Sequence, residues 1–369
     1  MRIDVLKLYN FRNYNRLTIS FHPNLNLIYG KNGSGKTNLV EAIYVLALTR
    51  SFRLVGDKTL ILDTTSMCKI EGTVFNTYST NYQILLSKEG KKVQINHDKV
   101  AKISDYVSKI PIVLFHPDDL RFIKDTPSTR RKTINISISL LDLPYLRYLN
   151  LYNKLLKQRN AYLKQMSVNG NSSSDYLTIL TDKLIQYGCY IHKKRQEFLV
   201  KINSYISSFY EKITGIKGLT LKYVSSYNDL NSDEIRNLYE KSLSKDLTFG
   251  KTAIGVHMDD IKFYLNDKDL KEYGSEGQQK NAIIAYKFSE IEVFKECKGY
   301  YPILILDDLF SELDEEKVQN ILSLLKTEIQ TFITTTDVDK LSFLPYLSYK
   351  QIHIQNGKVV EESEHERRK

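Results

Sequence analysis

Hydrophobic and polar residues alternate over short stretches through the first 120 residues, which predicts β-strands there with one helix between them. Residues 25–29 are an apolar run typical of a buried strand, and the apolar spacing from Thr37 to Leu48 predicts the helix. A further apolar strand is expected at 111–115, and a hairpin at Glu89–Gly90. Strands that surround a helix indicate an α/β fold.

After residue 120 the hydrophobic period becomes that of helices. Apolar residues keep helical spacing over 145–163 and again over 177–191, and a stretch rich in Ser, Asn and Gly at 167–175 predicts a loop between the two helices. Strand patterns return at 219–223. We therefore predict three parts: an N-terminal part of an α/β head (1–120), an inserted α-helical subdomain (121–217) and a C-terminal part of the head (218–369).

The C-terminal part contains two further strand patterns. Apolar runs at 303–306 and 331–334 read as buried strands, and Asn356–Gly357 predicts a tight hairpin turn. The last residues, 361–369, are mostly charged, and we expect them to be a frayed tail.

Positive charge is concentrated in the helical insertion. Residues 121–217 hold 17 Lys and Arg against 6 Asp and Glu, whereas the rest of the chain holds 36 basic and 37 acidic residues. Such an excess predicts contact with a polyanion, most simply the backbone of DNA, and the alternative is a solvated basic face. The residues that we predict to contact DNA phosphates are Arg130, Arg131, Lys157, Arg159, Lys193, Lys194 and Arg195.

Composition indicates a cytoplasmic protein that does not enter a membrane. No run of about 18 apolar residues is present, and the chain begins with a strand pattern instead of a signal peptide. Cys68, Cys189 and Cys297 stand apart from one another, which fits a reducing compartment and gives no metal-binding pattern.

The segment from Gly30 to Thr37, Gly-Lys-Asn-Gly-Ser-Gly-Lys-Thr, matches the P-loop pattern GxxxxGK[ST] between a predicted strand and a predicted helix. Its glycines let backbone N–H groups surround a β-phosphate at the positive end of a helix, where the lysine adds a point charge and the threonine hydroxyl is placed for Mg²⁺. The predicted ATP ligands are Gly30, Lys31, Asn32, Gly33, Ser34, Gly35, Lys36 and Thr37.

Two aspartates, Asp307 and Asp308, end the apolar strand that begins at Ile303. Asp307 is the candidate ligand of Mg²⁺, and Asp308 is the candidate carboxylate that polarises the attacking water. A solvated acidic turn is the alternative, which the nearby P-loop makes the weaker interpretation.

The order of these and further motifs resembles the RecF family, bacterial DNA-repair ATPases of the SMC-like ABC group. The resemblance extends from residue 10 to about residue 336, nearly the whole chain. Besides the P-loop and the paired aspartates, it rests on the segments Asn-Phe-Arg-Asn-Tyr (10–14), 113–120, 127–131, 156–161 and Gly-Ser-Glu-Gly-Gln-Gln-Lys (274–280). The segment Ser-Glu-Leu-Asp (311–314) resembles the one that follows the paired acidic residues in ABC proteins generally.

This resemblance implies a two-lobed, SMC-like ABC ATPase head that forms a homodimer when ATP is bound. Arg12 would join the P-loop residues at the nucleotide. Ser275, Gly277 and Gln278 would complete the site from the second subunit, because they open a helix whose positive end can face the γ-phosphate. ATP would then hold two subunits together until hydrolysis.

The resemblance also implies a function. The protein would bind single-stranded DNA and the junctions of gapped duplexes, with RecO and RecR as partners, and would act in replication, recombinational repair, RecA loading and SOS induction. Hydrolysis would be slow, DNA-stimulated and used as a switch, because Asp308 stands where transporters of the superfamily carry Glu and residues 334–336 lack a histidine.

Val256 and Met258 depart from the family pattern, which has Pro and Arg at those positions. Other ABC-type ATPases are the alternatives. A transporter subunit has no use for a basic insertion of this length, and a chromosome-organising ATPase would need long heptad arms between its motifs. An SMC-like ATPase of defence remains the residual alternative.

Overall fold

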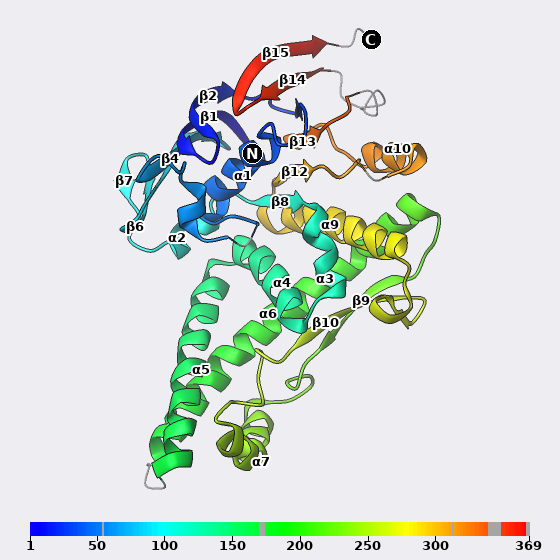
Figure 1. Ribbon diagram of the computed structural model, residues 1–369. Coiled ribbons are helices and arrows are strands. Elements are labelled where there is room, and N and C mark those ends of the chain that lie inside the picture. Colours follow the sequence, from blue (N-terminus) through cyan, green and yellow to red (C-terminus); the bar gives the residue numbers. More distant parts are fainter. Residues whose placement is uncertain (54, 170–173, 312, 339–347, 367–369) are drawn as a thin grey trace. The chain divides into compact units, whose positions relative to one another are not determined.

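The computed structural model describes residues 1–369 except 54, 170–173, 312, 339–347 and 367–369 (Figure 1). The described chain forms two compact units. Unit 1 contains residues 1–119, 211–216 and 284–369, and unit 2 contains 120–210 and 217–283. Residues 218–283, placed by the sequence in the C-terminal part of the head, therefore pack within unit 2, and the division into three domains stays a prediction.

The first sheet of unit 1 is antiparallel and runs in the order β2-β1-β4-β5-β6-β7. The β5–β6 turn confirms the hairpin predicted at Glu89–Gly90. Buried and accessible positions alternate along β4 and β5, because only one sheet face meets the core. Its strands are β1 (Arg2–Phe11), β2 (Tyr14–Ser20), β4 (Met67–Phe75), β5 (Ser79–Ser87), β6 (Gly90–Ile95) and β7 (Asp98–Lys99).

The second sheet of unit 1 is parallel except at one edge, in the order β15-β14-β3-β13-β12-β8. Because β3 and β12 are parallel, the loops after Tyr29 and Asp307 leave the same end of the sheet, where α/β proteins place ligands. Its strands are β3 (Leu25–Tyr29), β8 (Ile112–Phe115), β12 (Ile303–Asp307), β13 (Thr331–Thr335), β14 (Ser348–Gln355) and β15 (Lys358–Glu366).

The predicted frayed tail was wrong for residues 361–366. They belong to β15, which pairs with β14 as the antiparallel edge of the sheet. The Lys350–Glu362 ion pair shows how charged side chains are held there. The hairpin turn predicted at Asn356–Gly357 is confirmed.

Helix α1 (Lys36–Leu48) contacts strands of both sheets, including β4 and β13, and nearly all of its residues are buried. Gly72 of β4 shows how closely it packs, because a Cβ there would lie 2.2 Å from Cδ2 of Leu46. Unit 1 also contains α2 (Ser104–Val107) and α10 (Glu315–Ser323).

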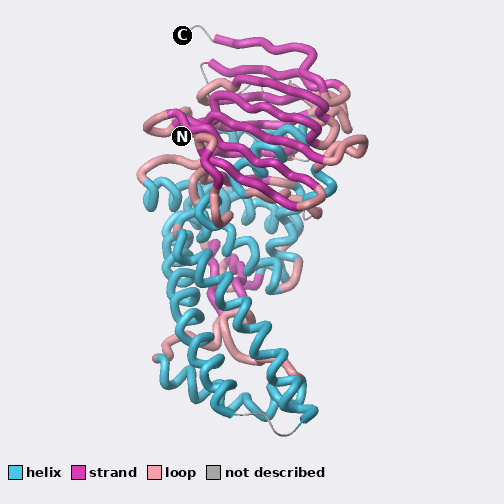
Figure 2. Tube along the Cα trace, turned by 90° about the vertical axis from the view of Figure 1, so that its left-hand side faces the viewer, coloured by secondary structure: helices cyan, strands magenta, loops and turns pink. Residues whose placement is uncertain are grey.

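Unit 2 is mainly helical and carries a small sheet, β11-β10-β9. Its long helices α5 and α6 lie side by side (Figure 2), with the Tyr148 ring 4.6 Å from Tyr190 and the Tyr162 ring 4.9 Å from Tyr176. Both predicted helices are thus confirmed, and they include residues 167–169, 174 and 175 at the ends of the stretch predicted to be a loop. The elements are α3 (Arg121–Lys124), α4 (Pro127–Leu141), α5 (Leu143–Asn169), α6 (Ser174–Thr214), α7 (Ser232–Phe249), α8 (Leu270–Tyr273), β9 (Leu219–Val224), β10 (Asp260–Leu265) and β11 (Lys268–Asp269). Helix α9 (Glu276–Lys298) has residues in both units, as has α6.

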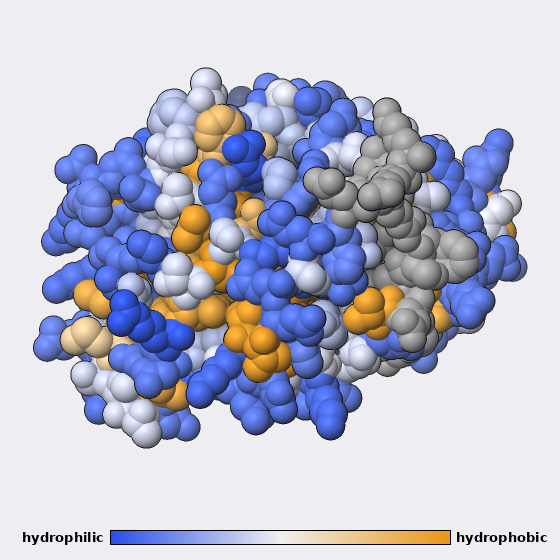
Figure 3. Space-filling model, turned by 90° about the horizontal axis from the view of Figure 1, so that it is seen from above, coloured by the Kyte–Doolittle hydropathy of each residue, from blue (hydrophilic) through white to orange (hydrophobic). Residues whose placement is uncertain are grey.

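The face seen from above in Figure 3 is mostly hydrophilic, with hydrophobic side chains in small areas among polar ones. Within the described part of the chain, no helix combines the length and hydrophobicity needed to cross a bilayer.

Candidate nucleotide site and basic residues

The P-loop leaves β3 and enters α1, as predicted. Gly35 has a φ of 117°, a conformation that favours glycine, and it caps α1 without any side-chain hydrogen bond. The first N–H groups of the helix are therefore available to an anion. The Ser34 hydroxyl is buried and has no hydrogen-bond partner among the described residues, which fits a loop built around a ligand.

Lys36 is 7% exposed, and its ammonium group donates to the carbonyl oxygens of Gly30 (2.7 Å) and Lys31 (3.0 Å). Burial lowers the pKa of Lys36, while the nearby carboxylates of Asp308 and Asp307 raise it. The lysine thus lies near both aspartates, while its hydrogen bonds go to backbone oxygens and it forms no ion pair that the structure describes. A phosphate group would supply the missing negative charge.

Asp307 ends β12 between two threonine hydroxyls. Its Oδ1 accepts hydrogen bonds from Thr334 Oγ1 (2.7 Å) and Thr37 Oγ1 (3.1 Å). Burial raises the pKa of Asp307, although these hydroxyls and the charges of His116 and Arg53 act in the opposite direction. A bound cation would favour the charged carboxylate. One carboxylate and one hydroxyl oxygen, completed by water and phosphate, are ligands that suit Mg²⁺.

Asp308 has a φ of 50°, which is uncommon for a residue other than glycine. Its N–H donates to Thr334 Oγ1 (2.9 Å), so the same threonine orients both aspartates. Strained backbone of this kind gathers at functional sites. The position fits the predicted catalytic carboxylate, and the role itself stays a prediction.

His116 and Arg53 also belong to this site, and sequence reasoning missed them. His116 Nε2 lies 3.7 Å from Asp307 Oδ2, and its Nδ1 accepts the Asp118 N–H (3.2 Å). Arg53 donates to Asn38 Oδ1 (3.0 Å) on α1. The signal for His116 was its place in the family-like segment 113–120. Arg53 carried no signal beyond following the P-loop helix.

Arg12, predicted at the nucleotide, forms a two-pronged ion pair with the buried Glu41 of α1 (2.8 and 2.9 Å). Its remaining nitrogen donates to the Thr59 carbonyl (2.9 Å). Arg12 therefore connects the β1–β2 turn to α1 in this structure, and its contact with nucleotide stays a prediction.

Ser275, Gly277 and Gln278 open α9 as a capping box. The Ser275 hydroxyl accepts the Gln278 N–H (3.3 Å), and the Gln278 side chain accepts the Ser275 N–H (2.9 Å). Ser275 and Gly277 are exposed, and a Cβ on Gly277 would meet no atom within 4 Å. The segment thus presents a free helix end, as the composite-site prediction requires. Glu312 of the Ser-Glu-Leu-Asp segment lies outside the described residues.

Three of the arginines predicted to bind DNA are buried in unit 2 and already paired. Arg159 is 1% exposed, with Nη1 2.7 Å from Asp246, and Arg195 is 2% exposed, with Nη1 2.9 Å from Asp259. Arg130 forms a two-pronged pair with Asp260 (2.5 and 2.9 Å). Burial and ion pairing contradict a direct phosphate contact in this conformation, because each charge is neutralised by a carboxylate inside the fold.

The other four predicted residues are more accessible. Arg131 is half-buried and donates to the Asp259 carbonyl (2.5 Å), and Lys194 pairs with Glu197 (3.0 Å). Lys157 and Lys193 are exposed.

The segment around the family departures supplies the partners of two buried arginines. Asp259 and Asp260 pair with them, and the Val256 carbonyl accepts from Arg195 Nη1 (2.7 Å). The Val256 side chain is buried and apolar, and its contact with Arg195 is made through the backbone carbonyl. Met258 is 58% exposed.

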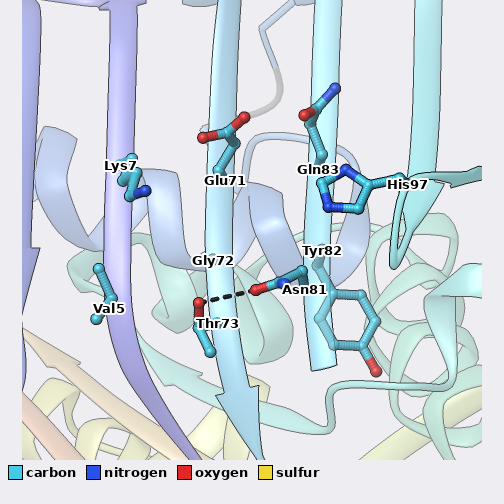
Figure 4. Close-up of a pocket in the computed structure, with 9 residues that line it drawn as sticks. All are labelled: Val5, Lys7, Glu71, Gly72, Thr73, Asn81, Tyr82, Gln83 and His97. Carbon is cyan, nitrogen blue, oxygen red and sulfur yellow. Dashed lines mark hydrogen bonds between the residues drawn. The ribbon is translucent and has the colours of Figure 1, made fainter. Parts of the chain in front are cut away.

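A separate cavity of about 140 Å³ lies on the outward face of the antiparallel sheet (Figure 4). Lys7 and Glu71 face each other in register across β1 and β4, and Thr73 donates to Asn81 Oδ1 (2.9 Å). His97 lines it from the β6–β7 turn. Its charges are of both signs and it has no glycine loop, so it does not share the chemistry of the P-loop site.

Comparison with known proteins supports the interpretation of these motifs. The family described as "RecF/RecN/SMC N terminal domain" matches residues 2–344. "DNA replication and repair protein RecF" of Bacillus subtilis is 37% identical over 98% of this chain and all of its own, and that of Streptococcus suis is 40% identical over 98% and 100%. A solved structure, "recombination mediator protein RecF-ATP in RecFOR pathway", has a TM-score of 0.90 at 32% identity and covers 98% of this chain and 97% of its own. An Smc head bound to part of ScpA has a TM-score of 0.56 at 15% identity over 99% and 98%.

Proposed function

Because this chain belongs to the RecF family and has the fold of an SMC-like ABC ATPase head, we propose that it is an ATP-dependent DNA-binding protein of DNA replication and repair. The observation that carries the proposal is the arrangement around Asp307. Its carboxylate contacts hydroxyls from the P-loop helix and from β13, beside the buried ammonium of Lys36.

Different residues of unit 1 would bind the phosphates, hold Mg²⁺ and orient the attacking water. The P-loop amides and Lys36 bind the phosphates, Thr37 and Asp307 hold Mg²⁺, and Asp308 orients the attacking water. Mg²⁺ would neutralise charge that develops on the phosphate oxygens. A carboxylate is a weak base near neutral pH, which suits slow hydrolysis used as a switch.

The exposed N-terminus of α9 supports an ATP-dependent homodimer. The capping box occupies the Ser275 hydroxyl and leaves the first amides of the helix free, so the helix end can receive the γ-phosphate of nucleotide bound to another subunit. A two-fold dimer would contain two such composite sites.

The DNA surface we propose is carried by exposed lysines of unit 2. This unit holds 25 basic and 16 acidic residues, and so nearly all of the chain's net charge of +10. Helix α5 contains no Asp or Glu, and its Lys154, Lys157 and Lys164 are exposed and pair with no group that the structure describes. Spacings of three and seven residues place them on one helix face, over about 15 Å of its length.

Lys193, which is exposed on the neighbouring α6, extends this set. Lysines act as point charges, so the surface would bind the DNA backbone by shape and charge without reading bases. Gaps and single-strand to double-strand junctions are the DNA forms we propose, with proteins of the RecO and RecR type as partners. RecA loading and SOS induction would be the processes served.

ATP binding is tested by replacing Lys36 with Met and titrating Mg²⁺–ATP by calorimetry. We expect the affinity to fall about a hundredfold, because a charge-assisted contact to the phosphates is lost. Lys99→Met, at an exposed position of β7 in the same unit, is the matched control and should bind like the parent. Equal affinities for all three proteins would refute the proposed site.

A further inference from the structure

We propose that Tyr14, together with Asn13 and Gly357, is a positioning device for ATP. These residues donate hydrogen bonds to two P-loop carbonyl groups on the side away from the phosphates, so that the N–H groups of the same peptides face the phosphates. The inference rests on the proposed function, because it takes the P-loop as the ATP site, but it assigns a role to residues outside that loop.

The Ser34 carbonyl is held by two turns from different parts of the chain. It accepts the Gly357 N–H (2.8 Å) from the β14–β15 turn and the Asn13 side-chain amide (3.4 Å) from the β1–β2 turn. Gly357 has a φ of 69°, and a Cβ there would lie 2.3 Å from the Asn13 carbonyl oxygen. The two turns thus lie against each other at the Ser34 carbonyl.

The Gly35 carbonyl is held by Tyr14. The Tyr14 hydroxyl donates to this oxygen (3.0 Å), which also accepts the first helical hydrogen bond of α1 from Leu39 (3.0 Å). Tyr14 is 0% exposed, and burial raises the pKa of its hydroxyl, so the group stays a proton donor. Gly35 itself is closely packed, because a Cβ there would lie 3.1 Å from that hydroxyl oxygen.

Because of peptide geometry, the hydrogen bonds to the two carbonyl groups also fix the directions of the N–H groups in the same peptides. In a planar trans peptide the carbonyl and the following N–H point in opposite directions. Both peptides are trans. Fixing the Ser34 carbonyl toward the two turns therefore directs the Gly35 N–H away from them, and fixing the Gly35 carbonyl toward Tyr14 does the same for the Lys36 N–H. These two donors lie where a P-loop surrounds a phosphate.

Tyr14→Phe removes one hydroxyl and keeps the aromatic ring in the core. We expect the affinity for Mg²⁺–ATP to fall three- to tenfold, the effect of about one hydrogen bond whose partner loses its fixed direction. Gly357→Ala should weaken ATP binding as well, because its Cβ displaces the turn that holds Ser34.

The chain offers a matched control in Tyr106. Its hydroxyl is equally buried and also donates to a backbone carbonyl of α1, that of Leu46 (2.5 Å), in the last turn instead of at the P-loop. Tyr106→Phe should lower the thermal stability of the nucleotide-free protein about as much as Tyr14→Phe does, and it should leave the ATP affinity unchanged.

The test uses five proteins: the parent, Tyr14→Phe, Gly357→Ala, Tyr106→Phe and Lys36→Met. Each is titrated with Mg²⁺–ATP by calorimetry, and each is unfolded thermally without nucleotide. Loss of affinity in the Tyr14 and Gly357 variants but not in Tyr106→Phe supports the positioning role. The role is overturned if Tyr14→Phe binds like the parent, or if both Phe variants weaken binding equally while Lys36→Met removes it. If Lys36→Met also binds like the parent, the proposed ATP site is what fails.

Discussion

In unit 1, the buried Lys36 donates to backbone carbonyls and lies near two aspartates without forming an ion pair that the structure describes, whereas in unit 2 Arg159 and Arg195 each reach a carboxylate within 3 Å. Both regions bury positive charge, but only the first leaves the charge available to a ligand. Net charge read from a sequence therefore indicates a binding surface only for those groups that the fold does not neutralise.

The largest effect is expected when an arginine of unit 2 loses its carboxylate partner. Asp246→Ala should reduce the free energy of unfolding by about 3–5 kcal/mol, because Arg159 becomes an uncompensated buried charge. Urea unfolding followed by circular dichroism measures the loss. Lys157→Ala, two positions before Arg159 on the same helix, should be nearly neutral. Similar stabilities for both variants would show that the Arg159 pair is not structural.

The exposed lysines of α5 are the positive charges of unit 2 that we expect to reach DNA. Replacing Lys154, Lys157 and Lys164 together with Ala should weaken duplex binding across sequences and flatten its dependence on log salt by about 2 to 3, since each phosphate contact contributes about 0.9. Fluorescence anisotropy at several salt concentrations measures both. Lys88, Lys92 and Lys99, exposed in unit 1, give the matched triple variant. If the salt dependence of DNA affinity is unchanged in the α5 variant, these lysines do not contact DNA phosphates and form only a solvated basic face.

The smallest effect is expected from a partly buried histidine of unit 2, His257. His257 Nε2 contacts the Thr252 carbonyl (2.9 Å) and Nδ1 contacts the Tyr152 hydroxyl (2.8 Å), which satisfies the neutral ring. Burial lowers the pKa of His257, with Arg131 and Arg159 adding to the effect and the Thr252 carbonyl and Asp259 opposing it.

Since the folded pKa is below the usual value of about 6.5, the unfolded chain takes up the proton first, and stability is lost as pH falls from about 6.5 toward the folded pKa. The slope is at most about 1.4 kcal/mol per pH unit for one proton. His257→Gln should show a shallower decline of the unfolding free energy below pH 6.5. Parallel curves for the two proteins would exclude this linkage.

The nucleotide site was predictable because its signals are local. Strand, glycine loop and helix follow one another between residues 25 and 48, and their observed bounds differ from the predicted ones by a single residue at Lys36. The paired aspartates likewise end a strand that its own apolar run identifies.

The buried arginines were not predictable in this way, because their partners are distant in the sequence. Arg159 pairs with a residue 87 positions away, and Arg130 with one 130 positions away. Asp259 and Asp260 can be read from the sequence, but the sequence does not show that they pair with Arg195 of α6 and Arg130 of α4. Strand β15 was missed for the same reason, since its charged residues become a strand only by pairing with β14.

The central claim is that ATP bound in unit 1 joins two subunits through the exposed start of α9. Sedimentation velocity of the Asp308→Asn protein tests it most directly, with and without Mg²⁺–ATP and a gapped duplex. Asp307 remains in this variant, so nucleotide should bind while hydrolysis slows. We predict a monomer without nucleotide, a dimer with ATP that co-sediments with the duplex, and no dimer when Ser275→Arg is added. The proposed dimer would be contradicted if the variant stayed monomeric at saturating ATP. It would also be contradicted if a dimer formed without nucleotide and persisted when Ser275→Arg was added.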